Sequence, residues 1–191
     1  MREHTPISLS APERLEWLRL IRSENVGPMT FYRLLEQFGS AGEALVALPE
    51  LARKGGRRDY RLFPSATAEV ELETLEKTGA SLVGYTEPEY PTLLRAMDGA
   101  PPLISAKGAL HLLAQPIIAV VGARNASLNG KKMASLLGKD LSEAGFTVWS
   151  GLARGIDTAA HTGAVARSTV AVMAGGVNVI YPRENTDLHQ R

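Results

Sequence analysis

Apolar residues in the first 80 positions recur every three or four residues, which is the spacing of helices that bury one face. Ser10 and Glu13 form an S-x-x-E capping pattern directly before Leu15, Leu18 and Ile21, which share one face of such a helix. The pattern therefore predicts a short helix that begins just after Ser10.

The stretch NVGPMTFYRLLEQFGS (25–40) predicts a turn followed by an amphipathic helix that ends at Gly39, a favourable residue for a helix C-terminus. It looks like a helix-hairpin-helix, whose turn presents main-chain N–H groups to a DNA phosphate. Because Pro28 removes one of those donors, a purely structural helical module stays the alternative. A second capping pattern at 40–43 and a helical pattern at 66–78 complete an all-helical region.

Residues 81–115 are rich in proline and in turn-forming residues, with short strand candidates at SLVGY (81–85) and PLISAKG (102–108). We place the domain boundary between a helical domain over 1–80 and a second domain over 81–191. In this interpretation the linking segment packs on the part of the chain that follows it.

From residue 116 the pattern changes to an alternation of strand, loop and helix. Apolar runs with β-branched residues predict strands buried on both faces, and Met133, Leu136, Leu137 and Leu141 mark one side of a helix. Successive β-α-β units predict a parallel sheet with helices on both faces, which is the α/β class. The predicted strands and helices, with a final shorter element, are in order 116–122, 129–144, 146–150, 157–167, 168–176 and 177–182.

Composition and charge narrow the choice of partner. The chain of 191 residues is 45% hydrophobic, enough for a core, and its formal net charge is +1. Residues 116–191 hold 8 Lys and Arg against 5 Asp and Glu, so a site for a polyanion has to be local. The densest basic run, RKGGRRDYR (53–61), is either a solvated loop between helices or an auxiliary phosphate contact.

Several classes of protein are excluded by residue usage. Without cysteine there is no disulfide scaffold, cysteine-zinc site or thiol nucleophile. The N-terminal segment lacks the apolar region of a secretory signal, and no window approaches the roughly 18 apolar residues of a membrane span. A cytoplasmic location is therefore expected.

The strands of a parallel sheet end at one edge, where ligands bind. Arg124 lies two residues beyond the first predicted strand, where a guanidinium can bind a phosphate through two hydrogen bonds; a surface salt bridge is the alternative. The next loop, SGLARGID (150–157), holds Arg154 between Gly151 and Gly155, which allow the main chain to approach an anion at a helix N-terminus. A third loop, AGGVNVIYPRENTDL (174–188), holds Gly175 and Gly176 at the same edge, and the three loops together predict a site for a phosphodiester or nucleotide.

Four side chains near these loops have two interpretations each. Ser127 is a helix N-cap or a phosphate donor, and Asp157 is an N-cap or an acid-base group. His161 is packed or lines the pocket, and Tyr181 stacks on a base or lies at a domain seam. The candidate phosphate-binding or DNA-binding residues are Gly122, Arg124, Ser127, Gly151, Leu152, Ala153, Arg154, Gly155, Gly175 and Gly176, and the candidate pocket-lining residues are Asp157, His161, Asn178, Tyr181 and Asn185.

The usual signatures of turnover are missing from the sequence. There is no G-x-G-x-x-G dinucleotide fingerprint, no P-loop, and no serine with an evident base. His4, His111, His161 and His189 do not have the spacing of metal ligands. We therefore interpret the site as one that binds rather than reacts, with no metal and no cofactor.

Three segments of the second domain closely resemble the signature segments of the DNA-processing protein A family (DprA, also called Smf): AVVGARNAS (119–127), WSGLARGIDTAAHTGAV (149–165) and TVAVMAGGVNVIYPRENTDL (169–188). The stretch YTEPEYPTLLRAMDGAPPLISAKG (85–108) resembles that family's connection between its domains. The resemblance implies a SAM-like or helix-hairpin-helix-like module followed by a Rossmann-like domain.

The resemblance also implies a function. Members of the family are cytoplasmic bacterial proteins that bind and protect single-stranded DNA during natural transformation and help load the RecA recombinase. They work as homodimers, without turnover and without a membrane. By motif match, Arg124 and residues 151–155 would line the DNA pocket. Ala174 and Asn178 replace the family's usual glycine and aspartate, and the family's domain continues beyond the position of Arg191, so the sheet is expected to be incomplete.

Two other classes of function compete with this one. A phosphoribohydrolase-like enzyme on a related fold would show P-G-G-x-G-T-x-x-E, but the corresponding stretch here is M-A-G-G-V-N-V-I, without the catalytic glutamate. A helical scaffold that binds only proteins would leave the arginine-bearing glycine loops without a purpose.

Overall fold

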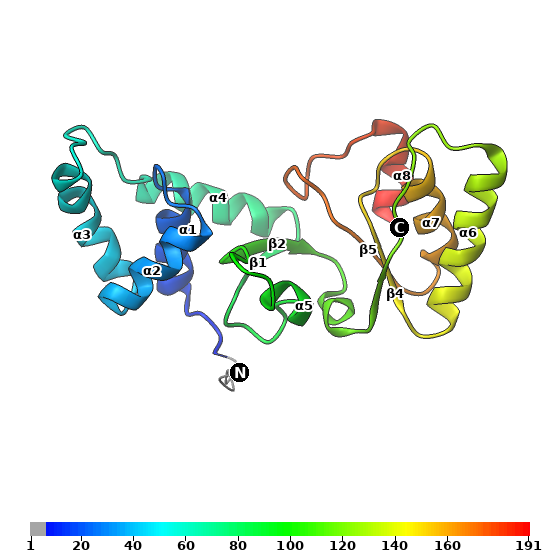
Figure 1. Cartoon of the computed structure of the whole chain (residues 1–191), viewed down its shortest axis with the longest axis horizontal. Coiled ribbons are helices and arrows are strands. Elements are labelled where there is room, and N and C mark those ends of the chain that lie inside the picture. The colour runs from blue at the N-terminus through cyan, green and yellow to red at the C-terminus, as the bar shows by residue number, and fades with distance from the viewer. Residues whose placement is uncertain (1–6) are drawn as a thin grey trace. The chain divides into compact units, whose positions relative to one another are not determined.

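The computed structural model describes residues 7–191, and its contacts divide the chain into two compact units. The first unit ends at Gly108 and the second runs from Ala109 to Arg191 (Figure 1). None of the helices within residues 7–191 is long and apolar enough to span a membrane.

The first unit begins with the predicted helices. They are α1 (Ala11–Arg22), α2 (Pro28–Phe38), α3 (Ala41–Lys54) and α4 (Ser65–Lys77). The capping box before α1 is confirmed, because the Ser10 side chain accepts from the Glu13 main chain while the Glu13 carboxylate accepts from the Ser10 N–H. Gly39 ends α2 in the left-handed conformation with φ 81°, as predicted.

Aromatic and aliphatic side chains of α1, α2 and α3 form the core of this unit. Trp17 and Phe31 meet edge to face with ring centroids 5.0 Å apart, and both are buried. Leu20, Leu34 and Leu45 pack around them. Of the face predicted for α1, Leu18 is buried and Leu15 and Ile21 are partly buried, whereas the fully buried Leu20 was not on it.

Two strands complete the first unit. β1 (Ala80–Gly84) pairs antiparallel with β2 (Leu103–Lys107), and the short helix α5 (Thr92–Arg95) lies between them in the chain. The Arg95 guanidinium stands over the Tyr85 and Tyr90 rings and donates to the main-chain oxygens of Tyr85 and Glu87. This cation therefore fixes the turn that connects the two strands.

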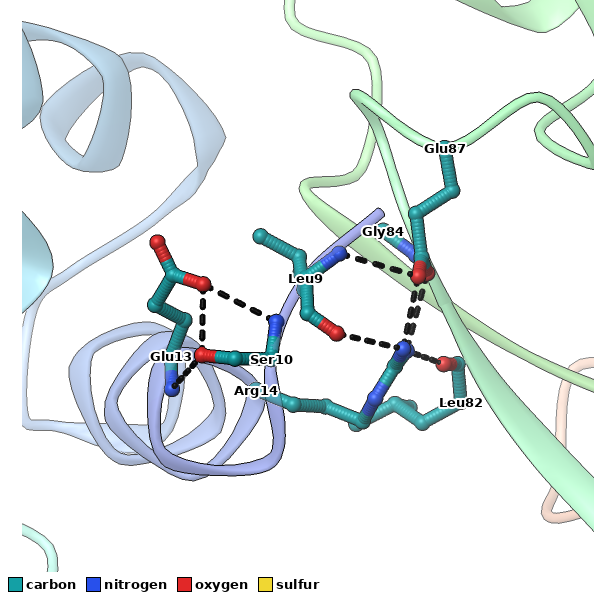
Figure 2. A network of polar contacts seen from close by, with 7 residues as sticks. All are labelled: Leu9, Ser10, Glu13, Arg14, Leu82, Gly84 and Glu87. Atoms are coloured by element: carbon teal, nitrogen blue, oxygen red, sulfur yellow. Dashed lines mark hydrogen bonds and ion pairs between the residues drawn. The ribbon is translucent and has the colours of Figure 1, made fainter. Parts of the chain in front are cut away.

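A partly buried ion pair ties α1 to the segment that follows β1 (Figure 2). The Arg14 guanidinium donates to both carboxylate oxygens of Glu87, at 2.8 and 2.6 Å, and also to the main-chain oxygen of Leu82. The Glu87 carboxylate further accepts from the N–H groups of Gly84 and Leu9. Burial alone would raise the pKa of Glu87, but the bonds from Arg14 and from these two main-chain groups outweigh it and lower the pKa.

These contacts divide the chain at a different place from the expected boundary. We expected residues 81–115 to pack on the part of the chain that follows, but residues up to Gly108 cluster with the helices. The reason is that β1 and β2 pair with each other and that Arg14 and Glu87 join α1 to the segment after β1. Neither partner of that ion pair is marked by the periodicity of the sequence.

The second unit contains a parallel sheet with the order β3-β4-β5. Its register pairs Ile118 with Val148, and Val148 with Thr169. The 3₁₀ helix η1 contacts β5. In chain order the elements are η1 (Leu110–Ala114), β3 (Ile117–Ala119), α6 (Leu128–Glu143), β4 (Thr147–Ser150), α7 (Ile156–Ala164), β5 (Thr169–Ala171), η2 (Arg183–Asn185) and α8 (Thr186–Gln190).

Helices α6 and α7 lie against each other and against β4 (Figure 1). Two glycines allow the close approach, because a Cβ at Gly138 would overlap the Ala160 carbonyl oxygen and one at Gly163 would overlap the Ser135 carbonyl oxygen. Val148, Ala160 and Ala164 form the buried cluster beneath this crossing. Main chain packed on main chain thus replaces large side chains in this core.

This packing overturns one sequence expectation about α6. Met133, Leu136 and Leu137 were expected to lie with Leu141 on the helix face that packs, yet all three are exposed. The buried face consists of Ala134, Gly138 and Ser142 instead, since only small residues fit against α7, and Leu141 is partly buried beside it.

Two further expectations about the sheet were wrong. Strand β3 is not buried on both faces, because it is an edge strand of three residues, two partly buried and one exposed. Residues 177–182 form no helix or strand and lead as a loop into η2.

We predict that Glu87→Gln lowers the free energy of unfolding of the first unit by about 2 kcal/mol at pH 7, because the Arg14 charge then loses its buried partner. The folded-state pKa of Glu87 is lowered, so its contribution is complete above the unfolded-state pKa and is lost as the pH falls through the folded value. The difference between wild type and variant should therefore narrow in acid. Hydrogen exchange of the α1 amides measures this free energy of unfolding. The exposed Glu89→Gln, which removes the same charge, is the control. Equal losses of stability in the two variants would contradict the prediction.

Candidate functional site

Two loops lie side by side at the carboxyl ends of β3 and β4. The Val120 N–H donates to the Trp149 oxygen at 2.9 Å, and the Ser150 hydroxyl donates to the Val120 oxygen at 2.6 Å. On the other side of β4, the Val172 N–H donates to the Ser150 oxygen. The predicted meeting of the loops at one edge is therefore seen in the hydrogen bonds.

Gly155 holds the two loops together. Its φ of 82° and ψ of −117° belong to a region that other residues rarely adopt, and a Cβ there would overlap the carbonyl oxygens of Ala123 and Arg124. The Ile156 N–H donates to the Ala123 oxygen at 3.3 Å, and a Cβ at Gly122 would meet the Ile156 side chain. Gly155 and Gly122 thus allow one loop to pack on the other; for Gly155 we had expected the close approach to be that of a ligand.

Asp157 fills the interior of the second loop. Its Oδ2 accepts from the N–H groups of Gly151, at 3.1 Å, and Ala153, at 3.4 Å, and the residue is only 6% exposed. The expectation that Asp157 is the N-cap of α7 was wrong, since Gly155 occupies that position. Because the aspartate takes two main-chain donors of the loop, those two donors are not available to a phosphate.

Asn185 ties the third segment to the same loop. Its amide Nδ2 donates to the Leu152 oxygen and to the Thr158 hydroxyl, both at 2.9 Å, and that hydroxyl donates to the Ala153 oxygen. Leu152 itself is buried at a positive φ of 55°. Leu152 and Asn185, both candidates from the sequence, therefore shape the loop from inside, and neither side chain is exposed.

His161 is a packed histidine. It is buried, its Nδ1 lies 2.7 Å from the Thr169 hydroxyl, and that hydroxyl donates to the Val148 oxygen, so Nδ1 is the donor to Thr169. Burial lowers the pKa of His161, and the Ser150 main chain and the Asp157 charge offset this only in part. The ring is therefore neutral at pH 7 and does not line an open pocket.

Two exposed arginines lie on these loops, and they differ in whether they form an ion pair with a described residue. Arg124 is exposed and makes no ion pair with any residue in the described part of the chain. Arg154 pairs through Nε with Glu184 Oε1 at 3.0 Å, with 57% and 55% of the two side chains exposed. Of these two arginines, Arg124 is thus unpaired among the described residues, and Arg154 is paired with an exposed carboxylate.

The remaining candidates divide between structural and exposed positions. Ser127 is the N-cap of α6, where its hydroxyl oxygen accepts from the Gly130 N–H at 3.1 Å. Gly175, Gly176 and Asn178 lie exposed in the loop after β5. Tyr181 follows them and is 71% exposed. The ring of Tyr181 is therefore accessible, as base stacking requires.

Other features of the edge were not predicted from the sequence. Lys131 and Lys132 are exposed on the first turns of α6 without an ion pair among the described residues. Their spacing of four and five residues after the N-cap was the available signal. Val121 and Val172 are exposed apolar residues in the loops after β3 and β5. Within residues 7–191 no group of three or more His, Asp or Glu side chains could hold a metal ion.

Two family models match this chain. The model of the DNA recombination-mediator protein A matches residues 81–191, and the model of a DprA-like N-terminal HHH domain matches residues 11–74. The second match confirms the predicted helix-hairpin-helix-like module, and the first covers all the loops described above.

Among similar proteins, the DNA processing protein DprA of Streptococcus pneumoniae is 33% identical and covers 80% of this chain and 55% of its own length. DprA of Bacillus subtilis is 34% identical over 61% of this chain and 40% of its own length. Protein Smf of Escherichia coli is 36% identical over 66% of this chain and 34% of its own length. The chain thus spans between about a third and about half of these relatives.

Two solved structures resemble the chain. The X-ray structure of DprA from Streptococcus pneumoniae matches with a TM-score of 0.67 and 27% identity over 96% of this chain and 64% of its own. A DprA structure from Helicobacter pylori matches with a TM-score of 0.53 and 24% identity over 58% of this chain and 50% of its own, which shows the fold alone. The predicted α/β class with a helical N-terminal module is confirmed.

We predict that Gly155→Ala destabilises the second unit by about 2 kcal/mol more than Gly145→Ala. Both glycines have a positive φ, but a Cβ at Gly145 has nothing within 4 Å, whereas one at Gly155 strikes two carbonyl oxygens. The comparison therefore separates close packing from backbone strain. Hydrogen exchange of the β4 amides measures both values, and equal losses would show that the two loops are not packed as described.

The buried His161 predicts a dependence of stability on pH. Its folded-state pKa lies below the unfolded-state value of about 6.5, so the unfolded chain binds the proton more readily as the pH falls. The second unit should lose stability below about pH 6.5, and His161→Gln should remove part of this loss. The exposed His111→Gln is the control. If hydrogen exchange of β4 has the same pH dependence in both variants, His161 is not the group responsible.

Proposed function

The chain belongs to the DNA recombination-mediator protein A family, and we propose that it binds single-stranded DNA at the carboxyl edge of the β3-β4-β5 sheet. The observation that carries this proposal is Arg124, an exposed guanidinium without an ion-pair partner in the described residues. The main chain beneath it is held by the contact of Gly155 with the Ala123 and Arg124 carbonyl groups. A cation on a fixed backbone suits two hydrogen bonds to one phosphate.

The other exposed side chains of the edge favour a single strand over a duplex. Val121 is exposed in the loop that holds Arg124, and Val172 and Tyr181 are exposed in the loop after β5. In a single strand both the phosphates and the faces of the bases are accessible, and bases stack on aromatic and apolar side chains. A duplex offers mainly its phosphates at such a surface, so only the cations of the edge would take part.

We propose binding without turnover at this edge. The Asp157 carboxylate is buried and engaged by two main-chain N–H groups, and the His161 ring is buried with Nδ1 on Thr169. Neither group is free to move a proton at a bound phosphodiester, and general acid-base catalysis requires such reach.

The finer cellular roles rest on family membership. The solved Helicobacter pylori relative is a protein described by its single-stranded DNA binding mode. For the whole protein we propose protection of incoming DNA in natural transformation, loading of the RecA recombinase, homodimer formation and a cytoplasmic location. These roles concern a protein longer than the part matched here.

We predict that Arg124→Ala lowers the affinity for a labelled oligothymidylate about tenfold and reduces the slope of log affinity against log salt by about one unit. Arg167→Ala is the matched control, because Arg167 is also exposed but precedes β5, at the opposite edge of the sheet. Fluorescence anisotropy across a salt series measures both, with a labelled duplex beside the single strand. Equal affinities of wild type and Arg124→Ala would move the DNA site elsewhere, with the basic run 53–61 as the next candidate.

A further inference from the structure

The ion pair between Arg154 and Glu184 lies on the surface proposed for DNA. Glu184 Oε1 contacts the Nε of Arg154 at 3.0 Å, on an edge of the guanidinium that a phosphate oxygen also uses. Arg124, on the neighbouring loop, has no such partner among the described residues. The free protein therefore holds one of its two rim arginines next to a carboxylate of its own.

The position of Glu184 does not depend on the ion pair. Its neighbours Pro182 and Asn185 are buried, and the Asn185 N–H donates to the Pro182 oxygen at 3.0 Å. The Asn185 side chain donates to the Leu152 oxygen, two residues before Arg154. The main chain of η2 is thus anchored on the same loop that carries the arginine, so Glu184 is held beside Arg154 before any pairing occurs.

Among residues 7–191, two carboxylates bind donors of this loop, and they differ in how readily an external anion can displace them. Asp157 is buried and accepts from two main-chain N–H groups, so its displacement would cost the loop both hydrogen bonds and move a buried side chain. Glu184 is 55% exposed, and water can solvate its carboxylate once the pair opens. Of the two, only Glu184 can be exchanged for an external anion.

We propose that Glu184 is an internal competitor of the DNA phosphate for Arg154, an inference that rests on the proposed function. A phosphate reaches Arg154 by displacing the Glu184 carboxylate, and the carboxylate charge opposes it until then. An isolated phosphate must do this alone, whereas a strand already held at Arg124 brings its next phosphate at high local concentration. Glu184 thereby favours a polynucleotide over a mononucleotide.

The test compares Glu184→Gln with Glu143→Gln, a matched loss of one negative charge from an exposed ion pair with Lys139 on α6. We expect Glu184→Gln to bind labelled oligothymidylate about threefold more tightly than Glu143→Gln does. The gain should disappear in the Arg154→Ala background, because the competitor then has no target. The affinity for thymidine monophosphate, measured by displacement of the labelled strand, should rise in Glu184→Gln by at least the same factor as the affinity for the strand.

The outcomes separate this inference from the proposed function. If Glu184→Gln binds no more tightly than Glu143→Gln, or keeps its gain without Arg154, Glu184 is not a competitor, and the Arg124→Ala result still decides the DNA site. If Arg124→Ala binds like wild type while the Glu184 effect depends on Arg154, the competitor stands and the role of Arg124 falls. Absence of binding by wild type would overturn both.

Discussion

The close contact of Gly155 with the Ala123 and Arg124 carbonyl groups is the constraint on which the candidate site depends. No side chain fits at that point, so the loop after β4 lies directly on the main chain of the loop after β3. The contact also sets where α7 begins, because Gly155 is its N-cap. As a consequence, Arg124 and Arg154 belong to two loops that are packed as one piece, and their spacing does not rely on either side chain.

Two carboxylates bind different hydrogen-bond donors at this edge. Asp157 takes the donors inside the second loop, and Glu184 takes Arg154 at the rim. Asp157 holds the loop and occupies two main-chain N–H groups, so a ligand cannot use them. In our proposal, a phosphate reaches Arg154 only by displacing the Glu184 carboxylate. Binding would then come from side-chain cations and exposed apolar groups, which predicts strong dependence on salt and little dependence on base sequence.

Local chemistry made much of the fold predictable. Capping at Ser10, the helix end at Gly39 and the alternation of strands and helices after residue 116 each act through neighbours in the chain, so they can be read from a short window. The parallel-sheet pattern likewise predicted that the loops of Arg124 and Arg154 meet at one edge. What remained hidden depends on contacts across the fold: the buried face of α6 is small because α7 approaches its main chain, and the Arg14–Glu87 pair joins segments that are 73 residues apart.

The most direct test of the account is to map an oligothymidylate onto the isotope-labelled chain by amide chemical shifts. The account predicts that the largest changes fall on residues 121–127 and 151–157, with smaller changes around Tyr181, while the Gly151 and Ala153 amides keep their hydrogen bonds to the buried Asp157 carboxylate. Changes confined to residues 53–61 or to the turn before α2 would contradict it, because the strand would then be held by the helical unit rather than by the edge of the sheet.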